Sequence, residues 1–327
     1  MPAPDKLAVL MPVFNGGPKL LTSLHSCAAA GLPADRYELI VVDNCSTDGA
    51  VENLPAADLN GAPVRVFRNS SNLGRVNNWN RAMEIATGLG FRYVTFLFAG
   101  DCWLPDSGIG ELLQLMQTYH TDIAFAPFVI SGEDGEIRRE SRRFYTTNTA
   151  VCSPAEFLST LLESGLFPLG PLQANIYRVS AGHRPYFNSA EPTRTDVEAT
   201  LDFVQQSKGT VLVASRPYLQ WREHAGRFHM SMGTGRTIED YMETFQRACR
   251  RVTLPLTRPV DFDRAKSGVV LNSLRLMISD APVLQWPKLL AVLAHCSFRT
   301  PYRVNIFHFF GTLWARFARG RRLLEFS

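Results

Sequence analysis

Glu38-Leu39-Ile40-Val41-Val42-Asp43 is the stretch of the chain that decides its fold. Its four consecutive apolar residues have the length and composition of a strand buried on both faces, which is typical of parallel sheets. The strand ends in a carboxylate and continues into a polar turn, Asn44-Cys45-Ser46-Thr47-Asp48-Gly49. Because open α/β sheets bind ligands beyond the carboxyl ends of their strands, this stretch also indicates where a site should lie.

Outward from this stretch, apolar runs of strand length alternate with helical patterns. Leu7–Pro12, Val64–Phe67 and Tyr93–Phe98 are the expected strands, and Lys19–Ala30 and Asn78–Gly88 are the expected helices. This alternation predicts an α/β domain with a mainly parallel, Rossmann-like sheet and flanking helices.

The rest of the chain divides into two parts. Ser131–Thr149 is polar and predicts a hairpin or a loop, and Pro154–Arg222 carries further short strands and helices. After Gly233 the pattern becomes helical, at Ile238–Val252, Phe262–Asp280, Leu284–Cys296 and Asn305–Leu324. We therefore expect a first domain over about residues 1–232, which carries the site, and a C-terminal helical extension over 233–327.

Composition limits the class of protein. The chain has 327 residues, of which 46% are apolar and 20% charged, with a net charge of +4, as in an ordinary globular protein with no expected nucleic-acid partner. The six cysteines form no Cys-x-x-Cys pair, which argues against a structural zinc site and a disulfide framework. Since we find no signal-peptide pattern and no run of about 18 apolar residues, we expect a cytoplasmic location.

Three more polar stretches follow the expected strands. They are Pro12-Val13-Phe14-Asn15, then Asn72-Leu73-Gly74-Arg75-Val76-Asn77-Asn78, then Gly100-Asp101-Cys102-Trp103-Leu104-Pro105. Carboxylates and amides at strand ends can bind a base, a ribose or, through a hard divalent cation, a diphosphate. Each stretch alone also fits an ordinary turn or helix cap.

Taken together and in this order, these stretches resemble family 2 of the glycosyltransferases, which have the glycosyltransferase A fold. The matching positions are Pro12, Phe14 and Asn15; Val41 to Asn44 with Ser46, Asp48 and Gly49; Asn72, Gly74 and Asn78; and Asp101 with Pro105. The resemblance spans residues 1–105. It implies an inverting enzyme of bacterial cell-surface polysaccharide assembly that moves a sugar from a nucleoside-diphosphate sugar onto an acceptor hydroxyl.

The resemblance also implies site residues. The nucleotide-sugar donor would be bound by Pro12, Phe14, Asn15, Asp43, Ser46, Asn72, Gly74, Arg75, Asn78 and Gly100. Asp101 would be the main protein ligand of Mn²⁺ or Mg²⁺, with His224 as a further ligand. The family's acidic loop often carries two or three acids, whereas Phe98 and Gly100 stand at such positions here. The donor's diphosphate would therefore have to supply most of the other metal ligands.

The general base would lie in the second half of the chain. Family members carry a Glu-Asp pair at the head of a helix, and the best match is Thr195-Asp196-Val197-Glu198, with Thr195 in place of the glutamate. We expect Asp196 to be the base, with Glu191 or Glu198 in reserve, although an acid there also serves as a helix cap. Gly170–Gln173 and Tyr177-Arg178 would line the acceptor side, and Trp221–His224 would close over the diphosphate.

The C-terminal segment 303–324 is basic and amphipathic. Its apolar residues recur at helical spacing, and arginines surround them: Ile306, Phe309, Phe310, Leu313, Trp314 and Phe317, with Arg303, Arg316, Arg319, Arg321 and Arg322. Such a helix can lie on the anionic inner face of the cytoplasmic membrane, or dock on the first domain with its arginines in water. A membrane contact would suit a lipid-linked acceptor, and otherwise the acceptor is a glycan.

Other classes of protein remain as alternatives. The single acid of the loop and the replacement of the glutamate by Thr195 favour a non-catalytic relative that binds nucleotide sugar or docks at a membrane. A nucleotidyltransferase would need a longer glycine-rich loop than Gly16-Gly17. A dinucleotide-dependent dehydrogenase is disfavoured because no Gly-x-Gly-x-x-Gly follows the first strand.

Overall fold

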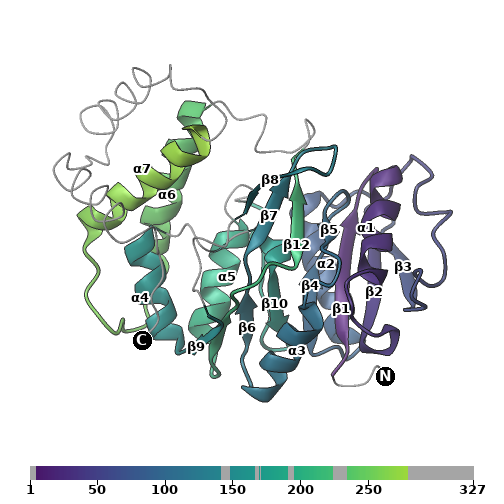
Figure 1. The fold of residues 1–327 in the computed structure, drawn as a ribbon, viewed down its shortest axis with the longest axis horizontal. Helices are drawn as coiled ribbons and strands as arrows, with labels where there is room; N and C mark the ends of the chain where they lie inside the picture. The colour runs from purple at the N-terminus through teal and green to yellow at the C-terminus, as the bar shows by residue number, and fades with distance from the viewer. Residues whose placement is uncertain are drawn as a thin grey trace. The chain divides into compact units, whose positions relative to one another are not determined.

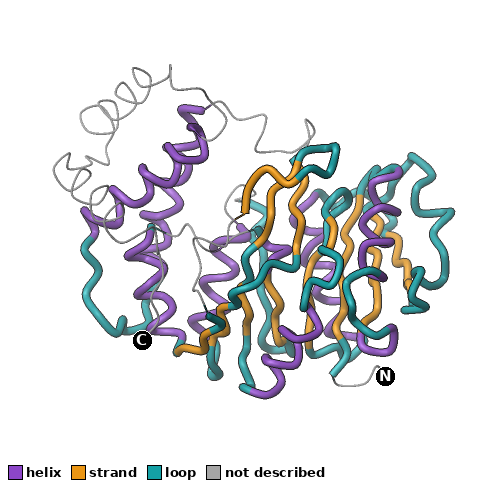
Figure 2. Tube along the Cα trace, in the orientation of Figure 1, coloured by secondary structure: helices purple, strands orange, loops and turns teal. Residues whose placement is uncertain are grey.

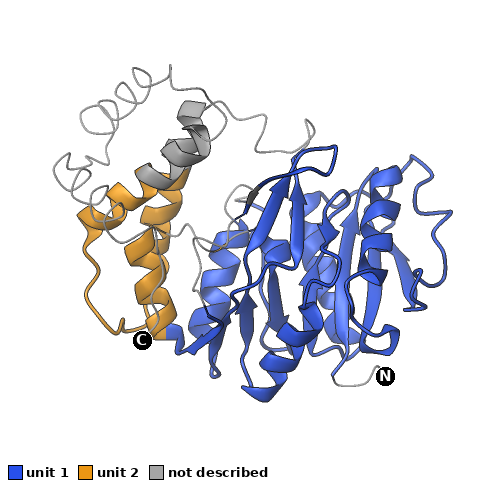
Figure 3. Cartoon of the chain, viewed as in Figure 1, with its two compact units in different colours: residues 1–154, 170–223 blue, residues 155–169, 224–327 orange. Residues whose placement is uncertain are grey.

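The computed structural model describes residues 5–140, 148–165, 169, 171–190, 195–223 and 234–278. The chain forms two compact units, shown in Figure 3. The first comprises Met1–Pro154 and Gly170–Glu223, and the second comprises Ala155–Leu169 and His224–Ser327. The domain boundary that the sequence predicts at residue 232 lies outside the described residues.

The first unit is built on a sheet whose parallel half begins the chain. Its strands lie in the order β3-β2-β1-β4 and are all parallel: β1 (Leu7–Val13), β2 (Tyr37–Asp43), β3 (Val64–Arg68) and β4 (Tyr93–Phe96). β2 is buried along its whole length, as its apolar run predicts. The chain adds β2 and β3 on one side of β1 and β4 on the other. The switch in direction between β1 and β4 is the place where such sheets bind ligands.

The other half of the sheet is mixed. It continues from β4 in the order β10-β6-β11-β9, with β6 (Ile123–Phe125), β9 (Ala150–Cys152), β10 (Asn175–Arg178) and β11 (Val211–Val213). β10 runs antiparallel to both of its neighbours, β4 and β6, and β9 is antiparallel to β11. The expected α/β architecture is confirmed, and its sheet is parallel in the half that carries the sequence motifs.

Helices flank this sheet, as Figure 1 shows. They are α1 (Pro18–Ala28), α2 (Arg75–Gly88), α3 (Ile109–Thr118) and α5 (Thr195–Gln206), with the short 3₁₀ turns η1 (Ala34–Arg36) and η4 (Leu172–Ala174). In α2 the buried side chains Val76, Trp79 and Met83 recur every three or four residues, which gives the helix one apolar face. α1 begins with a proline at its first turn, where no backbone donor is needed.

A small second sheet lies in the same unit. Its order is β5-β12-β7-β8, with β5 (Cys102–Trp103), β7 (Phe128–Ser131), β8 (Ile137–Glu140) and β12 (Leu219–Arg222), drawn in orange in Figure 2. β7 and β8 form an antiparallel hairpin, as the polar stretch after Ser131 predicts. β5 directly follows Asp101, so the acidic loop joins the two sheets.

The second unit contains α4 (Pro154–Ser164), α6 (Thr234–Arg251) and α7 (Phe262–Ile278). α4 approaches α7 closely, because a Cβ added at Gly165 would meet Val269 Cγ2 at 2.8 Å. The helices expected at 238–252 and 262–280 are confirmed by α6 and α7. Those expected at 284–296 and 305–324 lie outside the described residues. In the part of the chain that the structure describes, every helix is too short or too polar to span a bilayer.

Candidate active site

The loops that follow β1 and β2 are bound to each other by side chains. Asn15 N–H donates to Ser46 Oγ at 2.9 Å, and Thr47 N–H donates back to Asn15 Oδ1 at 2.9 Å. Asn15 and Cys45 have φ of 50° and 67°, in the left-handed region that few residues other than glycine adopt. Phe14, by contrast, is half exposed at the tip of the first loop, and Pro12 is partly buried. The two motifs therefore form one structured rim at the carboxyl edge.

Asp43 lies beneath this rim at the end of β2 and is fully buried. Its Oδ1 accepts a hydrogen bond from Ser46 N–H at 3.0 Å, as in an ordinary capped turn. Its Oδ2 lies 3.3 Å from Arg68 Nε. Arg68 also donates to the Ser46 carbonyl at 2.7 Å and pairs with Glu52. The carboxylate thus shapes the rim and carries a cationic partner that the sequence analysis did not include.

The loop after β3 is held by a network of asparagine amides. Asn72 Oδ1 accepts from Asn44 Nδ2 at 2.7 Å and from Gly74 N–H at 2.8 Å. Asn78 is buried, accepts from Asn69 and donates to the Val42 carbonyl at 3.0 Å. These bonds join the start of α2 to the end of β2. Asn72 and Asn78 therefore position the loop through contacts within the protein.

A stack of three planar side chains lies between this loop and the loop after β4. The guanidinium of Arg75 lies 5.0 Å from the ring centroid of Trp79, within the range of a cation–π interaction. Trp79 stacks in turn on Phe98, with 5.3 Å between centroids and 16° between planes. Phe98, which stands where the resemblance would place an acid, thus offers an aromatic surface to Trp79.

The loop after β4 carries Asp101 into the interior. Gly100 has φ of 100°, which favours glycine, and its N–H donates to Ser23 Oγ at 2.9 Å. Asp101 is fully buried, and each of its carboxylate oxygens accepts a hydrogen bond. Gln173 Nε2 donates to Oδ2 at 2.5 Å, and Arg222 N–H donates to Oδ1 at 3.1 Å.

Asp196 stands in the first turn of α5, as the sequence predicts. The side chain is partly buried, and its Oδ1 accepts a hydrogen bond from Val197 N–H at 3.0 Å. Burial raises the pKa of Asp196 above its ordinary value, and the positive charge of Arg75 opposes part of that rise. The negative charge of Asp196 in turn raises the pKa of Arg75. Desolvation has the larger effect, however, and the pKa of Arg75 is lowered below its ordinary value. Arg75 and Asp196 are therefore electrostatically coupled, although they come from different helices.

The other candidates for the base are placed differently. Glu198 is buried within α5, and two residues along a helix turn a side chain by about 200° from Asp196. Thr195, in the position of the family's glutamate, is buried, and its hydroxyl finds no hydrogen-bond partner among the described residues. Glu191, His224 and Gly170 lie outside the described residues.

Asp101 could bind a divalent cation only together with ligand atoms from a bound substrate. The residues that the structure describes contain no cluster of three or more His, Cys, Asp or Glu side chains. Asp101 is the acid of this loop that could supply hard oxygen ligands, and two N–H donors already hold its carboxylate. A cation there would need oxygens of a bound diphosphate as its other ligands.

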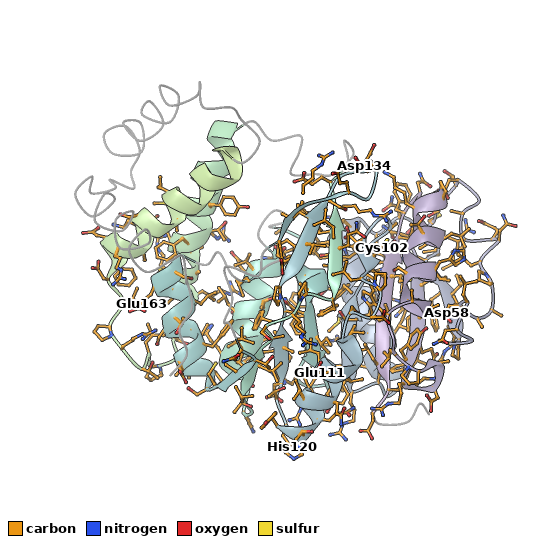
Figure 4. The ribbon with its side chains drawn as sticks, viewed as in Figure 1. Asp58, Cys102, Glu111, His120, Asp134 and Glu163 are labelled. Atoms are coloured by element: carbon orange, nitrogen blue, oxygen red, sulfur yellow. The ribbon has the colours of Figure 1, made fainter. Side chains whose placement is uncertain are left out.

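Several features of the site follow from the register rather than from the motifs. Arg68 pairs with Asp43 in the parallel register of β2 and β3, so a charged residue at the end of an expected neighbouring strand could have indicated it. Gln173 meets Asp101 across 72 positions of sequence, and nothing local predicts that contact. Figure 4 labels Asp134 and His120 at opposite ends of this unit. Asp134 lies in the β7–β8 turn, and His120 precedes β6 at the amino edge.

The fold and the arrangement of loops define a class of protein, the glycosyltransferase A fold. Within that class the chain belongs to Glycosyl transferase family 2, whose sequence profile matches residues 8–175, just over half of the chain.

Three known proteins illustrate the similarity. TuaG of Bacillus subtilis, described as a putative teichuronic acid biosynthesis glycosyltransferase, is 29% identical over 129 residues, 39% of this chain and 49% of TuaG. The match therefore spans about half the length of that relative. Residues 1–349 of S. aureus TarS, solved with UDP-GlcNAc, align with a TM-score of 0.59 at 17% identity, over 97% of this chain and 92% of that one.

A third neighbour is a mannosyltransferase from Pyrobaculum calidifontis, solved with GDP-Man and Mn²⁺. It aligns with a TM-score of 0.53 at 15% identity, over 98% of this chain and 88% of that one. At such identities the two structural similarities establish the fold.

Proposed function

We propose that the chain is an inverting glycosyltransferase that moves a sugar from a nucleoside-diphosphate sugar onto an acceptor hydroxyl, in the assembly of cell-surface polysaccharide. The observation that carries this proposal is that Asp43, Asp101, Arg75 and Asp196 all lie at the carboxyl edge of the sheet, where the charges of Arg75 and Asp196 interact. They come from the loops after β2, β4 and β3 and from the head of α5. Membership of family 2 supports the reaction, and the similarity to TuaG, described as a putative teichuronic acid biosynthesis glycosyltransferase, supports its setting.

The donor would lie across the rim made by the first two loops. The exposed ring of Phe14 offers an apolar surface to a base, and the Asn15–Ser46 bridge keeps that surface in place. The Arg68–Asp43 pair lies directly below, at the end of β2, where family 2 enzymes bind the base and ribose. Gly74 and Arg75 follow in the next loop, with no side chain at Gly74 to prevent close approach of a ligand.

Asp101 would be the protein ligand of Mn²⁺ or Mg²⁺, together with the oxygens of the donor's diphosphate, and His224 would be a further ligand. A cation held there would neutralise the charge that develops on the departing nucleoside diphosphate. The buried carboxylate of Asp101 fixes one ligand direction, because two N–H donors hold it.

Asp196 would act as the general base. It would take the proton of the acceptor hydroxyl while the acceptor oxygen bonds to the anomeric carbon. The bond from that carbon to the diphosphate breaks on the opposite face, so the configuration inverts and the nucleoside diphosphate leaves. A positioned base of this kind is worth roughly 10²–10⁴-fold in rate. The raised pKa of Asp196 brings its basicity closer to what proton abstraction at neutral pH requires.

The acceptor would be a glycan or a lipid-linked saccharide. The sequence places Tyr177 and Arg178 on the acceptor side, but Tyr177 is fully buried and both residues pair with the start of β4, away from the carboxyl edge, so they do not line an acceptor site. The basic, aromatic segment 303–324 supports a peripheral position on the inner face of the cytoplasmic membrane, next to a lipid-linked acceptor.

A panel of UDP-, GDP- and dTDP-sugars tests the proposal, with Mn²⁺ or with a chelator. Binding and slow hydrolysis are measured on the parent protein, on Asp101→Asn and on the control Asp106→Asn. Asp106 is an exposed acid shortly after β5 with φ of 50°, which asparagine tolerates. We expect metal-dependent hydrolysis of one donor, reduced on the order of 10²-fold in Asp101→Asn and unchanged in Asp106→Asn.

The same experiment distinguishes the enzyme from a non-catalytic protein that only binds nucleotide sugar. The lone acid Asp101 and the missing glutamate at Thr195 favour a non-catalytic binder. Donor binding that never leads to turnover, even with glycan and lipid-linked acceptors supplied, would support that binder. Failure to bind any donor would contradict both functions.

A further inference from the structure

The segment 183–187 contacts both of the helices that carry Arg75 and Asp196. We call this segment the strap; it follows β10 and precedes α5 along the chain. At its first residue, the ring of His183 stacks on the ring of Phe203 in α5, with 4.1 Å between centroids and 7° between planes. His183 Nε2 also lies 3.3 Å from the Phe203 carbonyl oxygen. One end of the strap is therefore attached to the helix of Asp196.

Asn80 attaches the other end of the strap to α2. Its Nδ2 donates to the Phe187 carbonyl at 2.7 Å, and its Oδ1 accepts from Phe187 N–H at 2.9 Å. Further along the helix, Arg184 donates to Thr87 Oγ1 at 3.2 Å and pairs with Glu84 at 3.4 Å. Asn80, Glu84 and Thr87 are spaced by four and three residues, which places them on one face of the helix. The strap thus lies along α2.

Phe187 joins the strap to the aromatic stack at the start of α2. It is fully buried, and its ring meets the ring of Trp79 edge-on, with 5.5 Å between centroids, and that of Phe96 in β4 at 5.8 Å. Buried backbone groups need hydrogen-bond partners, and Asn80 supplies one to the N–H and one to the carbonyl of Phe187. The place of Trp79, and of the Arg75 guanidinium above it, is therefore tied to that of the strap.

We propose that Asn80 is a positioning residue of the transfer site. By holding the strap against α2, it keeps the helix that carries Arg75 in place beside the helix that carries Asp196. This inference rests on the proposed function. It assigns to Asn80 a role that acts through other residues, since its amide is engaged by the backbone of Phe187.

The charges around Asp196 make its position measurable. Burial raises the pKa of Asp196, and the positive charge of Arg75 from α2 lowers it. Burial also raises the pKa of Tyr177 in β10 to about 12, with a contribution from the charge of Asp196, so Tyr177 is uncharged at neutral pH. Glu198 and Asp202 lie on the same helix as Asp196 and move with it. If Arg75 moved away, its lowering effect would be lost and the pKa of Asp196 would rise.

The test uses Asn80→Leu, which has nearly the shape of asparagine and removes both bonds to Phe187. Asn80→Ala is measured alongside, because it leaves room for water to solvate the backbone of Phe187 if the leucine variant does not fold. The matched control is Asn60→Leu, since Asn60 Nδ2 also donates to a distant backbone carbonyl, that of Leu32, at 3.0 Å. Asn60 precedes β3, at the amino edge of the sheet and away from the site.

The pKa of Asp196 is measured on the full chain by carbon NMR of isotope-labelled aspartate, with Asp196→Asn to assign the signal. We expect this pKa to be higher than in the parent both in Asn80→Leu and in Arg75→Gln. Asn60→Leu should keep the parent value. Arg75→Gln combined with Asn80→Leu should raise the pKa no further than Arg75→Gln alone, because both changes remove the effect of the same charge.

The kinetics of sugar transfer provide a second measurement. The kcat of Asn80→Leu should fall by roughly 10²-fold, because a small misplacement of catalytic groups is costly, while KM for the donor stays near the parent value. The acidic limb of its kcat profile should lie at higher pH than that of the parent. A merely structural role for Asn80 would lower Tm and leave the pKa of Asp196 at the parent value.

The two proposals fail in different ways. If Asn80→Leu and Asn80→Ala keep the parent pKa at Asp196 while Arg75→Gln raises it, the role of Asn80 is overturned and the proposed function stands. An unchanged pKa in Arg75→Gln would overturn that role as well, because the two charges would then not interact. If the pKa shifts as expected but the parent neither hydrolyses nor transfers the sugar of any donor, the proposed function fails. The role of Asn80 in transfer then fails with it, although its hold on the two helices stands.

Discussion

At the scale of single residues, Asp196 combines a helix-capping position with a perturbed carboxyl. Its Oδ1 accepts from the N–H of the adjacent Val197, in the first turn, where backbone donors have no partner within the helix, and burial raises its pKa. A group used only as a cap gains from being ionised beside the positive end of a helix dipole. Burial works against that ionisation at Asp196, and Arg75 restores part of it. This opposition is more typical of acid–base sites than of caps.

Asp196→Asn should therefore separate function from stability. Asparagine caps helices as well as aspartate does, so the fold should persist. Because burial raises the folded-state pKa of Asp196, ionising the carboxyl above that pKa reduces the stability of the folded protein, and asparagine removes this cost. We expect transfer to fall by roughly 10²–10⁴-fold, with a Tm within a few degrees of the parent at pH 7. Initial-rate kinetics and thermal melting check both.

The pH profile provides an independent check. A base must be deprotonated, so the parent's kcat should decline as pH falls through the pKa of Asp196, which lies above the value of about 3.9 for an exposed aspartate. Asp202→Asn on the same helix serves as the control and should keep the parent profile. Parent-like transfer by Asp196→Asn would remove Asp196 from the role of base.

At the scale of residues, sequence patterns predict which residues lie at the site. They predict less well which atoms each of these residues contacts. The position of Asp196 in the first turn of α5 matches its motif, and so does that of Asp101 after β4. Asn72 and Asn78 also belong to the motifs, yet their amides bond within the protein. The spacing of a motif cannot distinguish an amide that binds a ligand from one that stabilises a loop, because the backbone of the loop is the same in both cases.

At the scale of elements, β10 links the two sides of the site. Gln173, just before this strand, holds Asp101, and Tyr177 within it bonds the Thr200 hydroxyl of α5 at 2.9 Å. Asn175 Nδ2 donates to the Tyr177 hydroxyl at 3.1 Å, which completes a buried chain. Burial raises the pKa of Tyr177 to about 12, so its hydroxyl remains protonated at neutral pH and can donate. β10 thus fixes α5, and with it Asp196.

Tyr177→Phe should loosen α5 without affecting the donor side. Losing the hydroxyl leaves buried partners unsatisfied, at a cost of about 1–3 kcal/mol. We expect Tm to fall by several degrees and kcat to decline, with nucleotide binding unchanged. Combined with Thr200→Val, the loss of stability should be less than additive, since both changes break one bond. Additive losses would show that the hydroxyls act separately.

Element prediction succeeds where patterns are local. The buried run before Asp43 and the periodicity of α2 specify their elements directly. The antiparallel insertion of β10 between β4 and β6 depends on long-range pairing, which no short pattern encodes. The same limit explains why residues 155–169, which lie within the sequence of the first unit, group with the second.

At the scale of the whole molecule, the proposed membrane contact concerns the pair Arg321 and Arg322 within the segment 303–324. An arginine near an anionic surface contributes about 1 kcal/mol of binding. Replacing both by glutamine should therefore weaken binding to phosphatidylglycerol vesicles by about 2 kcal/mol, or roughly thirtyfold. Sedimentation of the full chain with such vesicles measures the change, and raising the salt concentration should reduce the difference.

The matched control is another arginine pair, Arg250 and Arg251 at the end of α6, where the side chains are exposed. Replacing that pair by glutamine removes the same net charge from a different surface, so a specific contact predicts vesicle binding close to that of the parent. Equal losses from the two pairs would mean that net charge alone drives the association. No binding of the parent to phosphatidylglycerol vesicles at low salt would instead favour a helix docked on the protein, and the acceptor would then have to reach Asp196 from solution.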